Sequence, residues 1–137
     1  MARGASILLI LLVLAPLAAC GDTDAPADVG VCWRMSHGAG QKVRFTPLAR
    51  GVDDLDTCAV LLEGLRVQGQ SDTDGAYQGN FIFVGAGPIA ASQRLSGFHY
   101  PIFQPPQRAA VDRDLKRMIA SRGGKMPDAS DVEIERR

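Results

Sequence analysis

Apolar and polar side chains alternate along two stretches around residue 40, and such alternation is typical of half-buried β-strands. The pattern predicts one strand at about 30–35 and a second at about 41–48. Residues 36–40, Ser-His-Gly-Ala-Gly, lie between them and are typical of a turn. The two strands are therefore expected to form a β-hairpin.

The next patterned stretch has the spacing of a helix rather than of a strand. Asp53 is a suitable N-cap residue, and a polar run that starts at Gly69 ends the pattern. The sequence therefore predicts a helix over residues 53–66. Its apolar side comprises Leu55, Cys58, Ala59, Leu62 and Leu65.

The second half of the chain predicts three more strands and one more helix. Residues 76–84 predict one central strand, and apolar residues on both faces near residues 81–84 indicate that this part is buried on both sides. Strands are expected at 89–95 and 98–103, and a helix at 108–122. The predicted fold is α+β: a small antiparallel sheet in the chain order β-β-α-β-β-β, with one helix packed on it and a C-terminal amphipathic helix.

The N-terminal residues are typical of an export signal. After Arg3 comes an uninterrupted apolar run, Ile7–Ala15. As a helix this run would span about 14 Å, whereas the hydrocarbon core of a bilayer is about 30 Å thick. The run is too short for a membrane span, so we interpret residues 1–19 as a signal peptide.

The end of this segment, Leu17-Ala18-Ala19-Cys20, resembles the lipobox of bacterial lipoproteins. The resemblance implies cleavage before Cys20, a diacylglyceryl group on its sulfur, a palmitate-type acyl chain on its amino group, and anchoring to a membrane that faces the periplasm. It also implies that Gly21, where an Asp would favour the inner membrane, permits the outer membrane. The alternative is a secretory peptide that is cut after Ala19 and leaves Cys20 as a thiol.

Four segments are expected along the chain. The signal peptide is followed by the lipidated cysteine and a flexible, acidic tether at 20–28. A compact α+β domain is predicted at 29–104. The C-terminal helix and a loose tail, which begins at about Lys125, occupy 105–137.

Composition and charge narrow the function classes. The chain has 137 residues, 46% of them hydrophobic, and carries 15 Lys and Arg against 15 Asp and Glu. This is the composition of a folded protein rather than a disordered one. Balanced charge argues against a general nucleic-acid binder, which needs a basic excess to neutralise phosphates. We expect neither a nucleic-acid partner nor a cofactor.

Cys32 and Cys58 are the two cysteines of the predicted domain. An exported protein meets an oxidising compartment, so a disulfide between them is expected. The alternatives are two reduced, buried cysteines, or a redox-active or metal-binding pair. If Cys32 faces the helix, strict alternation turns Trp33 to the other face, where the C-terminal helix is a candidate to cover it.

The residues that could carry catalysis or bind metal do not gather in the sequence. His37 and His99 have no second metal ligand at local spacing. The acids at residues 53–56 are explained by helix capping. Asp72-Thr73-Asp74-Gly75 lacks the further ligands of a calcium loop. We therefore expect neither an enzyme nor a metal site.

One segment predicts a binding face. Gly79 interrupts the expected central strand, and a glycine there is typical of a bulge or of close backbone approach. The residues beside it that would form the face are Tyr77, Gln78 and Asn80.

Several short sequences within residues 31–84 carry a further resemblance. They are Cys32-Trp33-Arg34, Phe45, Leu48-Ala49, Leu55, Cys58 and the run 77–84. In these the chain is similar to small uncharacterised proteins of alphaproteobacteria. The resemblance implies a compact, cysteine-paired domain and brings no activity with it.

Together these features predict a non-catalytic, lipid-anchored protein of the cell envelope, acting as an interaction or assembly-support module. Helix 108–122 is the candidate surface for an envelope protein partner, and the alternative is that it docks on its own sheet. The alternative function is binding of a small ligand or glycan in the periplasm. A third hypothesis, a hydrolase or redox accessory, would require a reactive thiol at Cys58.

Overall fold

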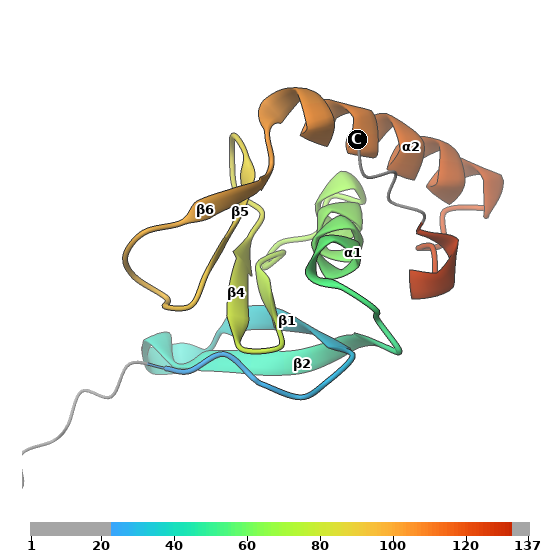
Figure 1. The fold of residues 1–137 in the computed structure, drawn as a ribbon. Coiled ribbons are helices and arrows are strands. Elements are labelled where there is room, and N and C mark those ends of the chain that lie inside the picture. Colours follow the sequence, from blue (N-terminus) through green and yellow to red (C-terminus); the bar gives the residue numbers. More distant parts are fainter. Residues whose placement is uncertain (1–22, 133–137) are drawn as a thin grey trace, which may run out of the picture.

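Residues 23–132 are described by the computed structural model, and they form one antiparallel sheet with two helices (Figure 1). The sheet has six strands in the order β2-β1-β3-β4-β5-β6. The strands are β1 (Val31–His37), β2 (Val43–Arg50), β3 (Gly75–Tyr77), β4 (Asn80–Phe83), β5 (Ile89–Ser92) and β6 (Tyr100–Phe103). The helices are α1 (Leu55–Val67) and α2 (Pro105–Ser121), with short 3-10 turns at η1 (Ala39–Gln41) and η2 (Ala129–Asp131). The predicted α+β fold class is confirmed. The predicted signal peptide and Cys20 lie outside the described residues.

Helix α1 is the centre of the core. Its N-cap is Asp54 rather than the predicted Asp53, and the Asp54 Oδ1 accepts a hydrogen bond from the Thr57 backbone N–H at 2.8 Å. Residues 57–65 are all buried. One side of α1 lies on the sheet and the other lies under α2, which explains why this helix is apolar almost all round (Figure 1).

The sheet and α1 approach each other most closely at β3. A Cβ atom added to Gly75 would lie 2.1 Å from the carbonyl oxygen of Trp33 and 2.6 Å from Cδ1 of Leu62. Any side chain at this position would push α1 or β1 away. Glycine at residue 75 therefore sets how near the helix lies to the sheet.

The predicted single strand at 76–84 is two strands joined by a tight turn. Ala76 pairs with Phe81 across the β3–β4 hairpin, and the turn residues Gln78 and Gly79 have φ values of 43° and 80°. Positive φ at both central residues is the geometry of the two-residue turn that suits the twist of a hairpin. The sheet therefore has six strands instead of five, and Gly79 forms a turn rather than a bulge.

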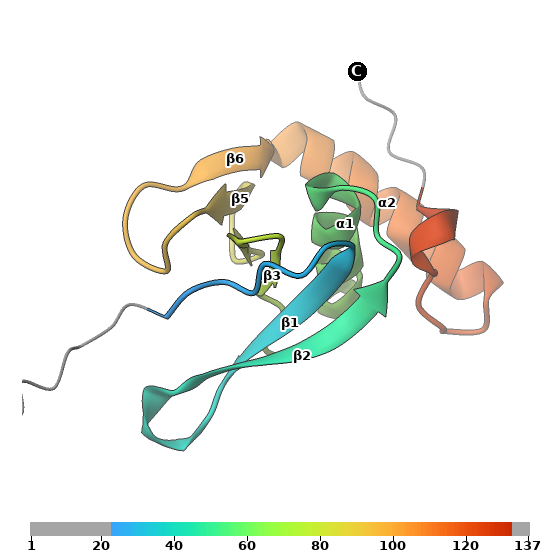
Figure 2. The same cartoon turned by 60° about the horizontal axis from the view of Figure 1, so that its bottom comes forward.

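The strand register separates the two faces of the sheet. Cys32 pairs with Tyr77, and both face the helices; Trp33 pairs with Ala76, which pairs with Phe81, and these face the other way. Both helices lie on the Cys32 side (Figures 1 and 2). The C-terminal helix therefore does not cover Trp33, because Trp33 belongs to an opposite face built from other aromatic side chains.

Helix α2 docks on its own domain. Its Leu115 is fully buried in the same core as α1. The chain after α2 also packs: Pro127 is buried, and Ala129 and Val132 are partly buried against this core. The predicted boundary at residue 104 therefore does not separate two units, and residues 126–132 are not loose.

The predicted tether is tied to the domain before it ends. The carbonyl oxygen of Pro26 accepts a hydrogen bond from the Gly79 backbone N–H at 2.8 Å, at the turn between β3 and β4. Of the predicted tether at 20–28, only the residues before Pro26 can therefore separate Cys20 from the domain.

Candidate functional site

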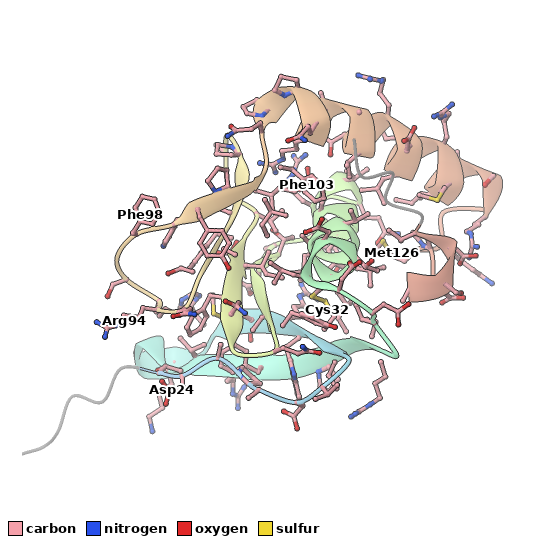
Figure 3. All side chains as sticks on the ribbon, in the orientation of Figure 1. Asp24, Cys32, Arg94, Phe98, Phe103 and Met126 are labelled. Atoms are coloured by element: carbon pink, nitrogen blue, oxygen red, sulfur yellow. A yellow bond between two sulfur atoms is a disulfide. The ribbon has the colours of Figure 1, made fainter. Side chains whose placement is uncertain are left out.

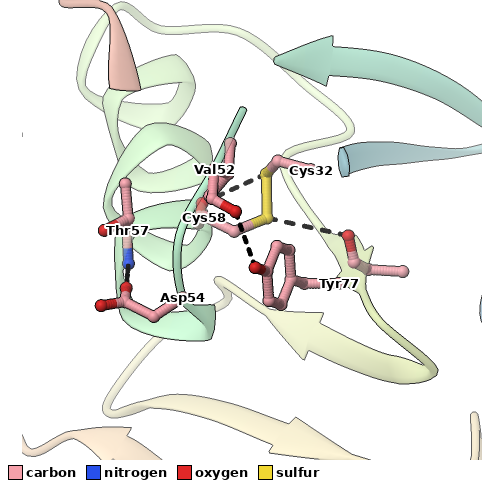
Figure 4. Close-up of a disulfide and its surroundings, with 7 residues drawn as sticks. Cys32, Val52, Asp54, Thr57, Cys58 and Tyr77 are labelled. Carbon is pink, nitrogen blue, oxygen red and sulfur yellow. Dashed lines mark hydrogen bonds between the residues drawn. A yellow bond between two sulfur atoms is a disulfide. The ribbon is translucent and has the colours of Figure 1, made fainter. Parts of the chain in front are cut away.

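A disulfide joins β1 to α1 in the middle of the core (Figure 4). Cys32 and Cys58 are both fully buried, and their Cα atoms are 5.3 Å apart. This confirms the predicted pairing. The two sulfurs are bonded to each other and are shielded from solvent, as expected for a structural cross-link. A redox-active pair needs an exposed thiol.

The three residues of the predicted binding face do not share one surface. Tyr77 is only 4% exposed, and its hydroxyl donates to the Val52 carbonyl oxygen at 2.7 Å (Figure 4). Burial raises the pKa of the Tyr77 phenol, which keeps it a donor. Gln78 and Asn80 lie at the surface: the Gln78 Oε1 accepts from the Gly30 backbone N–H, and the Asn80 Oδ1 accepts from the Tyr100 hydroxyl. The prediction is corrected for Tyr77, which belongs to the core.

A buried charge cluster lies between α1 and α2, and sequence reasoning missed it. Glu63 of α1 is fully buried, and both of its carboxylate oxygens accept hydrogen bonds from Arg108 of α2, at 2.8 and 2.9 Å. Arg66 also donates to Glu63 and bridges to Asp112 at 2.9 Å. The sequence predicts a different partner for Asp112, namely Lys116 one turn later. In the structure, Asp112 faces α1 and pairs with Arg66.

Arg108 uses every donor that it has. Besides Glu63, its guanidinium donates to the carbonyl oxygens of Val84, Gly85 and Gly87, in the β4–β5 connection. An arginine carries five N–H donors, and all five are paired here. Arg108 therefore fastens α2 to α1 and to the sheet at the same time.

The two carboxyl groups of the cluster have opposite pKa shifts. Burial raises the pKa of Glu63, but the hydrogen bonds from Arg66 and Arg108 outweigh burial and hold it below its usual value. Burial, together with the neighbouring Glu63 carboxylate, raises the pKa of Asp112 to about 6. The Asp112 Oδ1 is buried without a hydrogen-bond partner. Shifted carboxyl pairs occur in acid–base sites, but this pair is packed between two helices, where Glu63 pairs with Arg108 and Asp112 with Arg66.

The face of the sheet opposite the helices carries a row of aromatic rings. We call Trp33, Phe45, Phe81, Phe83 and His99 the aromatic face. The Phe81 ring centroid lies 6.2 Å from that of Phe45 and 6.3 Å from that of Phe83, and the His99 ring stacks on Phe83 at 4.0 Å. Phe81, in the centre of the row, is fully buried, while Phe83 is half-buried and His99 is exposed. The aromatic face therefore ends in rings that solvent can reach.

A hollow of about 320 Å³ opens beside this exposed end. Apolar walls come from Phe83, Ala90 and Pro101, and polar groups come from His99 and Gln104. Gly85, Ala86 and Pro88 complete the rim. An apolar floor with a few polar side chains is typical of small-ligand sites. A second hollow, of about 510 Å³, lies between the end of β2 and residues 126–130.

The remaining candidate residues lie at the surface or in structural contacts. His37 is exposed, and His99 stacks on Phe83. In the predicted turn 72–75, the Asp74 Oδ1 accepts from the Val84 backbone N–H at 2.7 Å, and the Asp72 carbonyl oxygen accepts from Arg34. Over residues 23–132, no three His, Cys, Asp or Glu side chains gather as metal ligands.

Comparison of the chain with protein-family models, with curated proteins and with solved structures gave no match. Neither α1 nor α2, the two long helices of the described part, combines the length and hydropathy needed to cross a membrane.

Proposed function

We propose that this chain is a lipid-anchored protein of the cell envelope that acts by binding and does not catalyse a reaction. The observation that carries the proposal is the order of charge, apolar run and lipobox-like residues that ends at Cys20. The Cys32–Cys58 disulfide supports it, because structural disulfides persist in oxidising compartments and are rare in the cytosol.

The use of the buried ionisable groups supports a binding role. Glu63 and Arg108 hold α1 and α2 together, and the buried phenol of Tyr77 donates to the backbone. Each of these groups has a partner that explains its burial. The groups that solvent can reach in the described residues are suited to binding: aromatic rings lie on one side of the molecule, and the charged outer side of α2 lies on the other.

Lipidation is tested by labelling cells that express the protein with radioactive palmitate. The wild type is expected to incorporate the label, and Cys20→Ala is expected to lose it and leave the membrane fraction. A wild type that matures but carries no label would contradict the anchor and favour cleavage after Ala19. Separation of inner and outer membranes then tests whether Gly21 allows the outer membrane.

A protein partner of residues 108–122 would have to bind the outward side of α2. The inward side is occupied, because Leu115 is buried and Arg108 is fully paired. Lys116 and Arg117 lie on the exposed side. Crosslinking in intact cells should identify neighbours that Lys116→Glu/Arg117→Glu loses and that the matched pair Lys116→Arg/Arg117→Lys keeps. If both variants crosslink to the same neighbours, the proposed partner site on the outward side of α2 is wrong.

Binding of a small ligand or glycan is the second candidate, and the hollow beside Phe83 and His99 favours it. Aromatic rings stack on the apolar faces of sugars, while His99 and Gln104 offer polar contacts. A screen of cell-wall sugars by thermal unfolding should find a ligand whose stabilisation is lost in His99→Ala. Stabilisation that His99→Ala and Gln104→Ala both retain would place the ligand elsewhere.

A further inference from the structure

Three segments that are distant in sequence lie at one end of the molecule. They are the first described residues, 23–24, the β1–β2 connection at 38–42, and the β5–β6 loop at 93–99 (Figures 1 and 2). Figure 3 places Asp24, Arg94 and Phe98 at this end. We call the three segments the proximal end, because the chain reaches the domain here.

The short tether keeps the proximal end near the attachment point at Cys20. Consecutive Cα atoms are about 3.8 Å apart, so three steps bring Thr23 to within about 11 Å of Cys20. Six steps reach Pro26, which is hydrogen-bonded to Gly79, and limit that distance to about 23 Å. Acyl chains on Cys20 would therefore hold the proximal end close to the lipid headgroups.

The proximal end carries the most exposed aromatic side chain of the described residues. Phe98 is 85% exposed, although the sequence predicts it at the start of the strand 98–103. Its neighbours are fixed: the His99 ring stacks on Phe83, and the Tyr100 hydroxyl donates to Asn80. These contacts hold the end of the loop against the sheet while Phe98 points outward (Figure 3).

Basic side chains accompany Phe98. Residues 93–99 contain Arg94, and residues 37–44 contain Lys42 and Arg44, while neither stretch contains an acid. Lys42, Arg44 and Arg94 are all exposed, and Arg44 extends along the β1–β2 connection, against Gly38. Asp24 belongs to the proximal end and Asp22 directly precedes this end in the sequence, so these two acids offset part of the basic charge. An exposed aromatic ring and exposed basic groups at the same end of a domain are the composition of an interfacial membrane contact.

We infer that the proximal end is a second membrane contact, with Phe98 seated among the headgroups and acyl chains of an anionic bilayer and Lys42, Arg44 and Arg94 on the lipid phosphates. The inference rests on the proposed lipid anchor. Its consequence is that the domain has one orientation: the proximal end faces the membrane, and the far end of α2 with η2 points away from it.

The test uses the acylated full-length protein, purified from membranes and reconstituted in vesicles. Mass spectrometry first establishes acylation of Cys20. Phe98→Trp places a fluorophore at the proximal end, and Ser121→Trp places one at the exposed far end of α2. The wild type, which has Trp33 as its single tryptophan, gives the background. The vesicles contain phosphatidylethanolamine and phosphatidylglycerol with brominated acyl chains, which quench tryptophans that enter the bilayer.

The fluorescence that each variant shows above the wild-type background is compared with and without bromine. Bromine should reduce this fluorescence roughly twofold in Phe98→Trp and leave it unchanged in Ser121→Trp. The quenching should weaken in phosphatidylcholine vesicles, or when Arg94→Gln is added. Acylated protein in which neither added tryptophan is quenched, or both are quenched equally, would overturn the oriented contact and leave the anchor intact. A chain without acylation would overturn the anchor and this inference together.

Discussion

Replacement of Arg108 by methionine tests whether one buried side chain holds α2 on the domain. Arg108 is 7% exposed, and its five N–H groups pair with two carboxylate oxygens of Glu63 and with three backbone carbonyls. Methionine keeps much of the apolar stem but removes the charge and all five donors. Glu63 would then depend on Arg66, whose side chain is 40% exposed.

The expected loss of stability is large. Removing one partner of a buried ion pair costs about 3–5 kcal/mol, because the other charge stays buried without compensation. The three carbonyl oxygens that lose their donor add to this cost unless water reaches them. Since a domain is stable by about 5–15 kcal/mol, Arg108→Met should remove a major part of the free energy of unfolding.

Urea unfolding followed by circular dichroism measures the effect, with Arg117→Met as the matched control on the same helix. Arg117 pairs with Asp114 at the surface, so its loss should change the free energy of unfolding by no more than about 0.5 kcal/mol. The double variant Glu63→Met/Arg108→Met should recover much of the loss, since no buried charge is left unpaired. If Arg108→Met unfolds within about 1 kcal/mol of the wild type, the proposed fastening is wrong.

Three further predictions concern pH, close packing and the disulfide. The raised pKa of Asp112, about 6, makes its protonated form favour folding, so this contribution is lost as pH rises through 6. The lowered pKa of Glu63 acts oppositely, and its contribution is lost as pH falls below the usual 4.5. Melting temperatures should therefore decrease as pH rises from about 4.5 to about 6 in the wild type, and less in Asp112→Asn; parallel pH profiles in this range would count against the pKa assignment. Gly75→Ala should destabilise by about 1–3 kcal/mol or more in urea unfolding, because its Cβ meets the Trp33 carbonyl, while Gly85→Ala, with open space around it, should have little effect. Reduction with dithiothreitol should lower the free energy of unfolding by about 3.5 kcal/mol, as expected for a 27-residue loop, and should not affect Cys32→Ala/Cys58→Ala.

The predictions that depended on local periodicity agree with the structure. The β1–β2 hairpin and α1 follow alternation and helical spacing, and the ends of both elements differ from the predicted ones by a few residues. The Cys32–Cys58 pairing could also be predicted, because residues 29–104 contain only these two cysteines and an amphipathic helix carries one of them. Each of these inferences needs only the residue pattern of one short segment or the number of cysteines.

The misinterpreted elements needed information that periodicity does not carry. In residues 76–84 the turn is marked by Gln78 and Gly79, but this dipeptide is not the usual Asn-Gly, and the aromatic residues on both sides of it also fit one continuous strand. Phe98 resembles a core residue by type, but it is exposed, while its neighbour His99 stacks on Phe83 and Tyr100 bonds to Asn80. In both cases, contacts with another strand decide the conformation.

Glu63 is the residue whose position in the sequence indicates the buried charge cluster. It lies in the middle of an otherwise apolar stretch of α1, where a charge is stable only with a buried partner. Of the basic residues in 108–122, Arg108 lies in the first turn of α2, and only the packing of α2 across α1 brings the two together. Because that contact occupies the inward side of the helix, the surfaces left for binding are the charged outer side of α2 and the aromatic face, on opposite sides of the molecule. A membrane contact at the proximal end would leave the far end of α2 facing away from the bilayer. An envelope partner of α2 would then have to approach the domain from that side.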